Sequence, residues 1–61
     1  MEWQKSKKYL LTIDNNGKSF FYNGFIISES EDGFLTFQDE RIGKVLFNKQ
    51  KIIKIEECEQ Q

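Results

Sequence analysis

The amino-acid sequence predicts an all-β fold in which five short strands form a small, strongly bent sheet or barrel. Three observations lead to this prediction. Proline is absent, aromatic and β-branched residues dominate the middle of the chain, and the glycines stand where turns are needed. With 61 residues the chain makes one domain, near the lower size limit for folding alone. Five short strands joined mostly by hairpin turns fit a small barrel better than a sandwich.

The first two strands are expected at residues 9–13 and 18–29. Residues 14–17 (DNNG) between them are a strong turn signal, because Asn and Gly tolerate positive φ. The second strand is long, and Gly24 in its middle predicts a bend or bulge where the strand curves around the barrel.

The last three strands are expected at residues 34–39, 44–48 and 51–56. Hairpin turns are expected at residues 31–33 (EDG) and 40–43 (ERIG), and the short connection at 48–50 predicts one helical turn. The chain thus divides into an N-terminal arm at 1–8, a single β-barrel domain at 9–56 and a polar tail at 57–61. The arm has little apolar periodicity, so only a short helical turn is expected there.

The second strand is apolar on both faces, because successive side chains of a strand point to opposite sides. The two sets are Phe20, Tyr22 and Ile26 on one face and Phe21, Phe25 and Ile27 on the other. A five-strand barrel has one interior, so the surplus face needs a cover. The cover is either the arm with Trp3 or another subunit.

The residue inventory argues against an enzyme. Histidine is absent, so no imidazole base or histidine metal ligand exists, and no glycine-rich phosphate loop is present. Cys58 is the single cysteine, which excludes an intrachain disulfide and a zinc site. Glu29, Glu31 and Asp32 offer carboxylates to a divalent cation, but a solvated hairpin turn is the simpler interpretation. We expect no catalytic residue, no cofactor and no metal.

The charges are balanced in number and segregated along the chain. The formal net charge is −1, which argues against a protein that coats nucleic acid without regard to sequence. The acidic block within residues 28–40 consists of Glu29, Glu31, Asp32, Asp39 and Glu40. The basic block within residues 44–54 consists of Lys44, Lys49, Lys51 and Lys54, and the arm adds Lys5, Lys7 and Lys8. Opposed blocks suit head-to-tail contact between identical subunits, whereas lysines also serve simply to protect strand edges.

The apolar runs are too short for a transmembrane span, and residues 1–5 lack the apolar core of a signal peptide. We therefore expect no membrane association and a cytoplasmic location.

Two segments carry a family resemblance. Residues 20–28 (FFYNGFIIS), followed by 34–37 (FLTF), form a strand with a central glycine, a turn and an apolar strand. Residues 43–55 (GKVLFNKQKIIKI) form an apolar strand, a tight turn and a β-branched strand. These segments are similar to the first and second motifs of the Sm-like family, which includes the bacterial host-factor RNA chaperone. The resemblance implies a bent sheet of the SH3/Sm type, rings joined through the fourth and fifth strands, and binding of uridine-rich or adenine-rich RNA.

Two functions are therefore open. The first is a non-catalytic, Sm-like module that binds single-stranded RNA as a homo-oligomer. Its expected nucleic-acid-binding residues are the stacking aromatics Tyr22 and Phe34 and the polar or charged Asn48, Lys49, Gln50 and Lys51. The second is a small protein-binding regulator or inhibitor that uses an aromatic patch or an open strand edge. Low basicity favours the second function, and the motif register favours the first. RNA binding through lysines should weaken steeply with salt, while an apolar protein contact should not.

Overall fold

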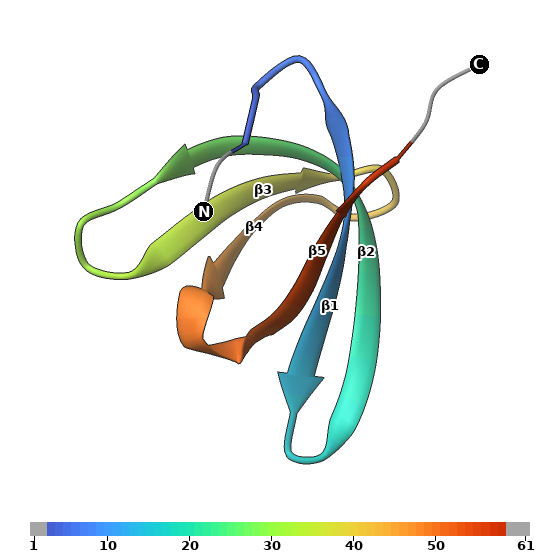
Figure 1. Cartoon of the computed structure of the whole chain (residues 1–61), viewed down its shortest axis with the longest axis vertical. Helices are drawn as coiled ribbons and strands as arrows, with labels where there is room; N and C mark the ends of the chain where they lie inside the picture. The colour runs from blue at the N-terminus through green and yellow to red at the C-terminus, as the bar shows by residue number, and fades with distance from the viewer. Residues whose placement is uncertain (1–2, 59–61) are drawn as a thin grey trace.

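The computed structural model, which describes residues 3–58, contains a single antiparallel sheet of five strands (Figure 1). The elements in chain order are β1 (Lys8–Asn15), β2 (Lys18–Glu29), β3 (Phe34–Asp39), β4 (Gly43–Asn48), the 3₁₀ turn η1 (Lys49–Lys51) and β5 (Ile52–Glu57). The strand order across the sheet is β4-β3-β2-β1-β5. The prediction of five strands in an all-β fold is confirmed, and so is the helical turn between the last two. Within the described residues β4 and β5 are not paired with each other, so the sheet is open.

The β1–β2 hairpin has the tightest connection. Asn16 and Gly17 form a two-residue loop with φ of 54° and 82°. Positive φ at both loop residues matches the right-handed twist of the flanking strands, and Asn-Gly adopts it with little strain. Strand β1 therefore continues through Asn15, two residues beyond the expected end of the first strand.

Strand β2 belongs to both halves of the bent sheet. It pairs with β1 along 18–25 and with β3 from Gly24 onward, so the sheet folds over at this point. A Cβ atom added to Gly24 would stand 1.8 Å from the carbonyl oxygen of Gln38, so only glycine fits between the crossing strands. The bend at Gly24 is confirmed. The β-bulge lies beyond it, between Ile26 and Ser28.

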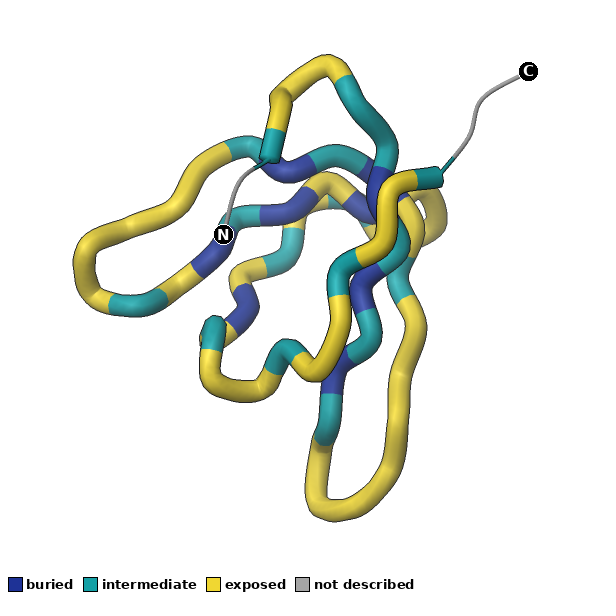
Figure 2. Tube along the Cα trace, in the orientation of Figure 1, coloured by how far each residue is buried: buried dark blue, intermediate teal, exposed yellow. Residues whose placement is uncertain are grey.

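The core fills the inside of this bend. Its buried members are Tyr9, Leu11, Ile13, Ile26, Leu35, Phe37 and Phe47 (Figure 2). They alternate with outward-facing residues along each strand, as expected for a sheet with one covered face. The rings of Tyr22 and Phe47 lie 4.8 Å apart between centroids, so the inner face of β2 reaches β4 across the interior.

The N-terminal arm covers part of the inner side of the sheet rather than its outer face. Trp3 packs against the core cluster, and its indole N–H donates to the Glu29 carboxylate at the end of β2. The Tyr9 hydroxyl accepts from the Gln4 N–H at 2.8 Å and holds the arm in a turn. The outer face of β2 stays partly open, because Phe21 is 56% exposed.

One carboxylate is buried in the fold. Asp39 ends β3 and accepts hydrogen bonds from the N–H groups of Arg41 (2.8 Å) and Ile42 (3.1 Å), and from that of Asn23 (3.2 Å). Burial alone raises the pKa of this carboxyl. The N–H groups of Arg41 and Ile42 outweigh burial and hold the pKa below its ordinary value, and the Arg41 guanidinium and the Asn23 N–H lower it further. Asp39 thus fixes the β3–β4 turn to the bend in β2.

Candidate functional site

Strand β5 is an edge strand of the sheet, paired only with β1. Cys58 donates its N–H to the Lys8 carbonyl at 2.8 Å, which shows that this residue faces β1. Because hydrogen-bonding direction alternates along an antiparallel strand, the backbone N–H and C=O groups of Lys54 and Glu56 also point toward β1. Ile55 and Glu57 therefore direct their N–H and C=O groups to the open side. An extended chain can pair with them.

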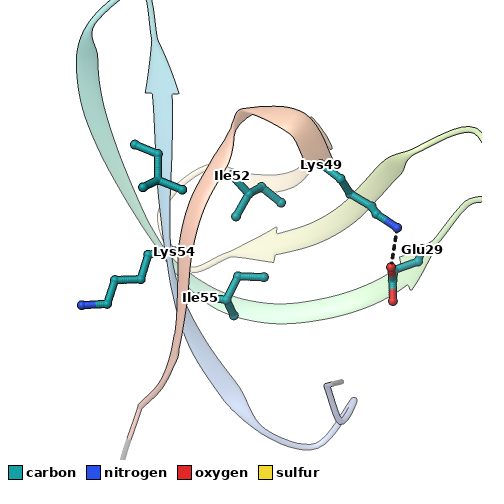
Figure 3. Close-up of a pocket in the computed structure, with 6 residues that line it drawn as sticks. Glu29, Lys49, Ile52, Lys54 and Ile55 are labelled. Atoms are coloured by element: carbon teal, nitrogen blue, oxygen red, sulfur yellow. Dashed lines mark hydrogen bonds and ion pairs between the residues drawn. The ribbon is translucent and has the colours of Figure 1, made fainter. Parts of the chain in front are cut away.

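A groove of about 480 Å³ runs beside this edge (Figure 3). Its lining residues are Glu29, Lys49, Ile52, Ile53, Lys54 and Ile55. They come from the end of β2, from η1 and from β5, so the groove lies along β5 and reaches the end of β2. In a closed barrel with this strand order, β4 and β5 would pair with each other, whereas here they do not.

The isoleucines of the groove have different surroundings. Ile52 and Ile55 are half-buried and pack against the core, facing Ile13 and Leu11 across the strand pair. Ile53 is 60% exposed, because the register shift between β1 and β5 leaves it without an opposite residue. The bulge therefore presents an apolar side chain to solvent at the edge of the groove.

A charged group closes one end of the groove. The ammonium group of Lys49 lies 2.8 Å from the Glu29 carboxylate, which also accepts from the Trp3 indole (Figure 3). The hydrogen bond from Lys49 and then that from Trp3 hold the pKa of Glu29 below its ordinary value. Glu29 is therefore ionised at neutral pH. Trp3, the only tryptophan of the chain, reports on this end of the groove.

The residues expected from the sequence to bind RNA fall into two groups. Phe34 and Asn48 are opposite each other on β3 and β4, and Gln50 and Lys51 are exposed on the adjoining turn. These four share one corner of the molecule. The Asn48 side chain already makes a hydrogen bond at this corner, because its Oδ1 accepts from the Gln50 N–H at 2.9 Å. Lys49 is bound to Glu29, and Tyr22 is half-buried against Phe47.

The two charge blocks meet within a single chain. Lys49 pairs with Glu29, and Lys8 of the arm pairs with Glu40. Lys7 also pairs with Glu57 at 2.9 Å. Two acidic residues of the 28–40 block, Glu29 and Glu40, are thus paired with lysines of the same copy and are less available for head-to-tail contact.

Comparison of the chain with protein-family models, with curated proteins and with solved structures finds no match. The site combines backbone groups free to pair, a groove lined by three isoleucines and charged residues at its rim. In residues 3–58 no cluster of three or more potential metal ligands occurs, and no helix is long and apolar enough to cross a membrane.

Sequence reasoning found the charged residues of this region and missed its apolar ones. The pattern of residues 51–56 (KIIKIE) predicts only a strand. Which isoleucine is exposed depends on the bulge, and the bulge depends on pairing with β1, which is distant in sequence. The sequence offers Trp3 as a cover for the sheet, but nothing in the sequence links it to Glu29.

Proposed function

We propose that this protein is a non-catalytic binding module that recognises an extended polypeptide segment at the open seam between β4 and β5. The observation that carries the proposal is the unpaired edge of β5 beside an apolar groove. A segment added to β5 would satisfy the free backbone groups of Ile55 and Glu57. Alternate side chains of the segment would enter the groove, which supplies specificity in this mode of recognition.

The same proposal accounts for the shape of the domain. We regard the fold as a barrel of the SH3/Sm type that is left open at one seam, which the strand order β4-β3-β2-β1-β5 supports. An added strand would fill the gap between β5 and β4 and complete the enclosure of the core.

Charge around the seam restricts the segment. Lys51 is exposed just before β5, and Glu56 is exposed near its end. A segment that runs antiparallel to β5 begins beside Glu56 and ends toward Lys51. We therefore expect a preferred segment to have apolar or aromatic residues at alternate positions and an acidic residue near its C-terminal end.

The test is selection from a displayed library of random peptides of about ten residues, long enough to span one strand. A selected peptide is then titrated into the protein while Trp3 fluorescence is followed. Changing Ile53 to lysine (I53K) is expected to weaken binding by about tenfold or more, because it places a charge at the groove. Stability should change little, since Ile53 is 60% exposed.

The matched control is Ile42→Lys. Ile42 is 62% exposed in the β3–β4 turn and does not line the groove, so the chemical change is the same in a different place. The proposal requires that I42K bind like the unmodified protein. Equal losses in I53K and I42K, or selected peptides without the alternating pattern, would contradict it.

Binding of single-stranded RNA is a second candidate, favoured by the corner that holds Phe34, Asn48, Gln50 and Lys51. An exposed ring next to polar donors and a cationic side chain fits base stacking combined with a phosphate contact. If the protein has this function, the resemblance to Sm-like proteins further implies a ring in which β4 of one copy pairs with β5 of the next.

This candidate makes its own prediction. Labelled oligo-U and oligo-A should bind with an affinity that falls steeply with salt, and Lys51→Gln should reduce the logarithmic salt slope by about 0.7. The mass in solution should be a multiple of 7.3 kDa matching a closed ring. Absence of salt-dependent binding, together with a mass below that of a ring, would exclude it.

A further inference from the structure

Besides the outer edges of β4 and β5, an open edge lies along the first half of β2, on the side away from β1. Strand β2 pairs with β3 only from Gly24 onward, and Asn23 is bonded to Asp39 and Glu40, so residues 18–22 have a paired neighbour, β1, on one side alone. Figure 1 shows the β1–β2 hairpin extending away from the rest of the sheet, and Figure 2 shows its tip and the adjoining part of β2, residues 15–21, as exposed. Phe20 and Phe21 are 42% and 56% exposed there.

The direction of the free backbone groups follows from Asn23. Its N–H donates to Asp39, and its carbonyl accepts from the Glu40 N–H at 2.9 Å, so both groups face away from β1. Because this direction alternates along a strand, the backbone N–H and C=O groups of Phe21 and Ser19 also point away from β1. The Phe21 carbonyl accepts from the exposed Arg41 side chain at 3.1 Å, which agrees with this assignment.

Apart from the exposed Arg41 side chain, this edge lacks the usual protection of an exposed strand. Natural edges carry charges, bulges or prolines that prevent pairing with other chains. The edge of β5 has a bulge and lysines, and β4 has Lys44. The stretch from Ser19 to Asn23 (SFFYN) has no charge, no proline and no register shift against β1. It is rich in aromatic residues of high β propensity.

We propose that this edge pairs with the same edge of a second copy, forming a two-fold symmetric dimer with Phe20 at the axis. The free groups are self-complementary in this register. Ser19 of one copy stands opposite Phe21 of the other, and each directs its N–H and C=O to its opposite residue. The two Phe20 side chains face each other directly, at a position where antiparallel strands approach most closely.

Electrostatics and symmetry favour a second copy over a foreign strand. No charged residue lies between Ser19 and Asn23, and the two Lys18 side chains lie at opposite ends of the contact, so the Arg41 side chain on the Phe21 carbonyl is the charge that borders this edge. Each copy has one such edge, so the contact is isologous and closes at two subunits. Only Arg41 must move off the Phe21 carbonyl, and its side chain is 72% exposed.

The interface is small, because it consists of one short strand and two phenylalanines from each copy. It falls below the size of stable interfaces, so a dissociation constant on the order of 100 µM is expected. The dimer is independent of the groove at β5, and the two proposals can fail separately.

The first measurement is sedimentation equilibrium from about 5 to 500 µM, a range chosen to bracket this dissociation constant. The mass should rise from 7.3 kDa toward twice that value. Phe20→Lys should abolish the rise, because it places two ammonium groups at the axis. Ile53→Lys should leave the rise unchanged. A constant monomer mass over the whole range would overturn the proposal, and so would loss of dimer in I53K.

The register is tested by cross-linking in a Cys58→Ser background. Facing residues at the axis lie within disulfide reach, so Phe20→Cys should give a covalent dimer under mild oxidation. Lys18→Cys is the matched control. Its two copies lie about 14 Å apart along the pair, too far for a disulfide, and should remain monomeric. Equal cross-linking of the two cysteine variants would overturn the proposed register. Circular dichroism of both variants confirms that the fold is kept.

Discussion

Replacing Gly24 with alanine is expected to unfold the domain or to leave it only marginally folded. The new Cβ would lie 1.8 Å from the Gln38 carbonyl oxygen, 2.8 Å from its carbonyl carbon and 3.1 Å from the Asp39 Cα. All three atoms belong to the backbone of β3, so no side-chain rotation relieves the clash. The strands must separate at the bend that encloses the core. The cost should exceed about 4 kcal/mol, against a total stability of roughly 3–9 kcal/mol for a chain of this size.

Gly33→Ala is the matched control for this substitution. Gly33 has φ of 90°, and a Cβ added there meets nothing within 4 Å. Alanine at this position suffers only backbone strain of about 1–2 kcal/mol. Urea unfolding of both variants measures the difference. A Gly24→Ala protein as stable as Gly33→Ala would show that β2 and β3 are not in this close contact.

Replacing Asp39 with asparagine is expected to lower the free energy of unfolding by about 2 kcal/mol at neutral pH. The side chain is almost fully buried and accepts from backbone N–H groups of β2, next to the bend, and of the β3–β4 turn. Hydrogen bonds to a charged acceptor are stronger than those to a neutral amide, and a buried donor left without a partner is costly. Asp32→Asn is the control, since Asp32 lies exposed in the β2–β3 turn.

Asp39 also makes stability depend on pH. Its pKa in the folded state lies below the ordinary aspartate value of 3.8, so the folded state favours the ionised carboxylate more than the unfolded state does. The resulting stabilisation is fully present above the unfolded pKa and is lost as the pH falls through the folded pKa. Unfolding curves between about pH 2 and 7 should therefore show a steeper acid loss in the unmodified protein than in D39N. Parallel curves for the two proteins would contradict the role given to Asp39.

The sequence predicted the local elements well, because they depend on neighbouring residues. The Asn16-Gly17 loop and the bend at Gly24 each follow from the conformational range of the residues involved. The same reasoning could not foresee the bulges near Ile27 and Ile53, since a register shift is decided by pairing between strands that are distant in sequence. Each bulge changes which side chains face outward.

The candidate site was less predictable for the same reason. It is assembled from the end of β2, from η1 and from β5, and no local pattern indicates that these segments meet. Tyr22 looked like an exposed ring in the sequence, yet the inward phase of β2 places it against Phe47. The sequence predicts Asp39 only as the last residue of a strand, without indicating that its side chain is buried. An aspartate before a turn that ends in glycine is a signal for the backbone-capping role it performs.

Amide hydrogen exchange on β5 tests the central claim most directly. In the free protein, the Ile55 and Glu57 amides should exchange quickly, while those of Lys54 and Glu56, which face β1, should be protected. Addition of a selected peptide should slow exchange at Ile55 and Glu57 and leave the other two unchanged. Binding without new protection at Ile55 and Glu57, or protection already present in the free protein, would show that the edge of β5 is not where the segment is added.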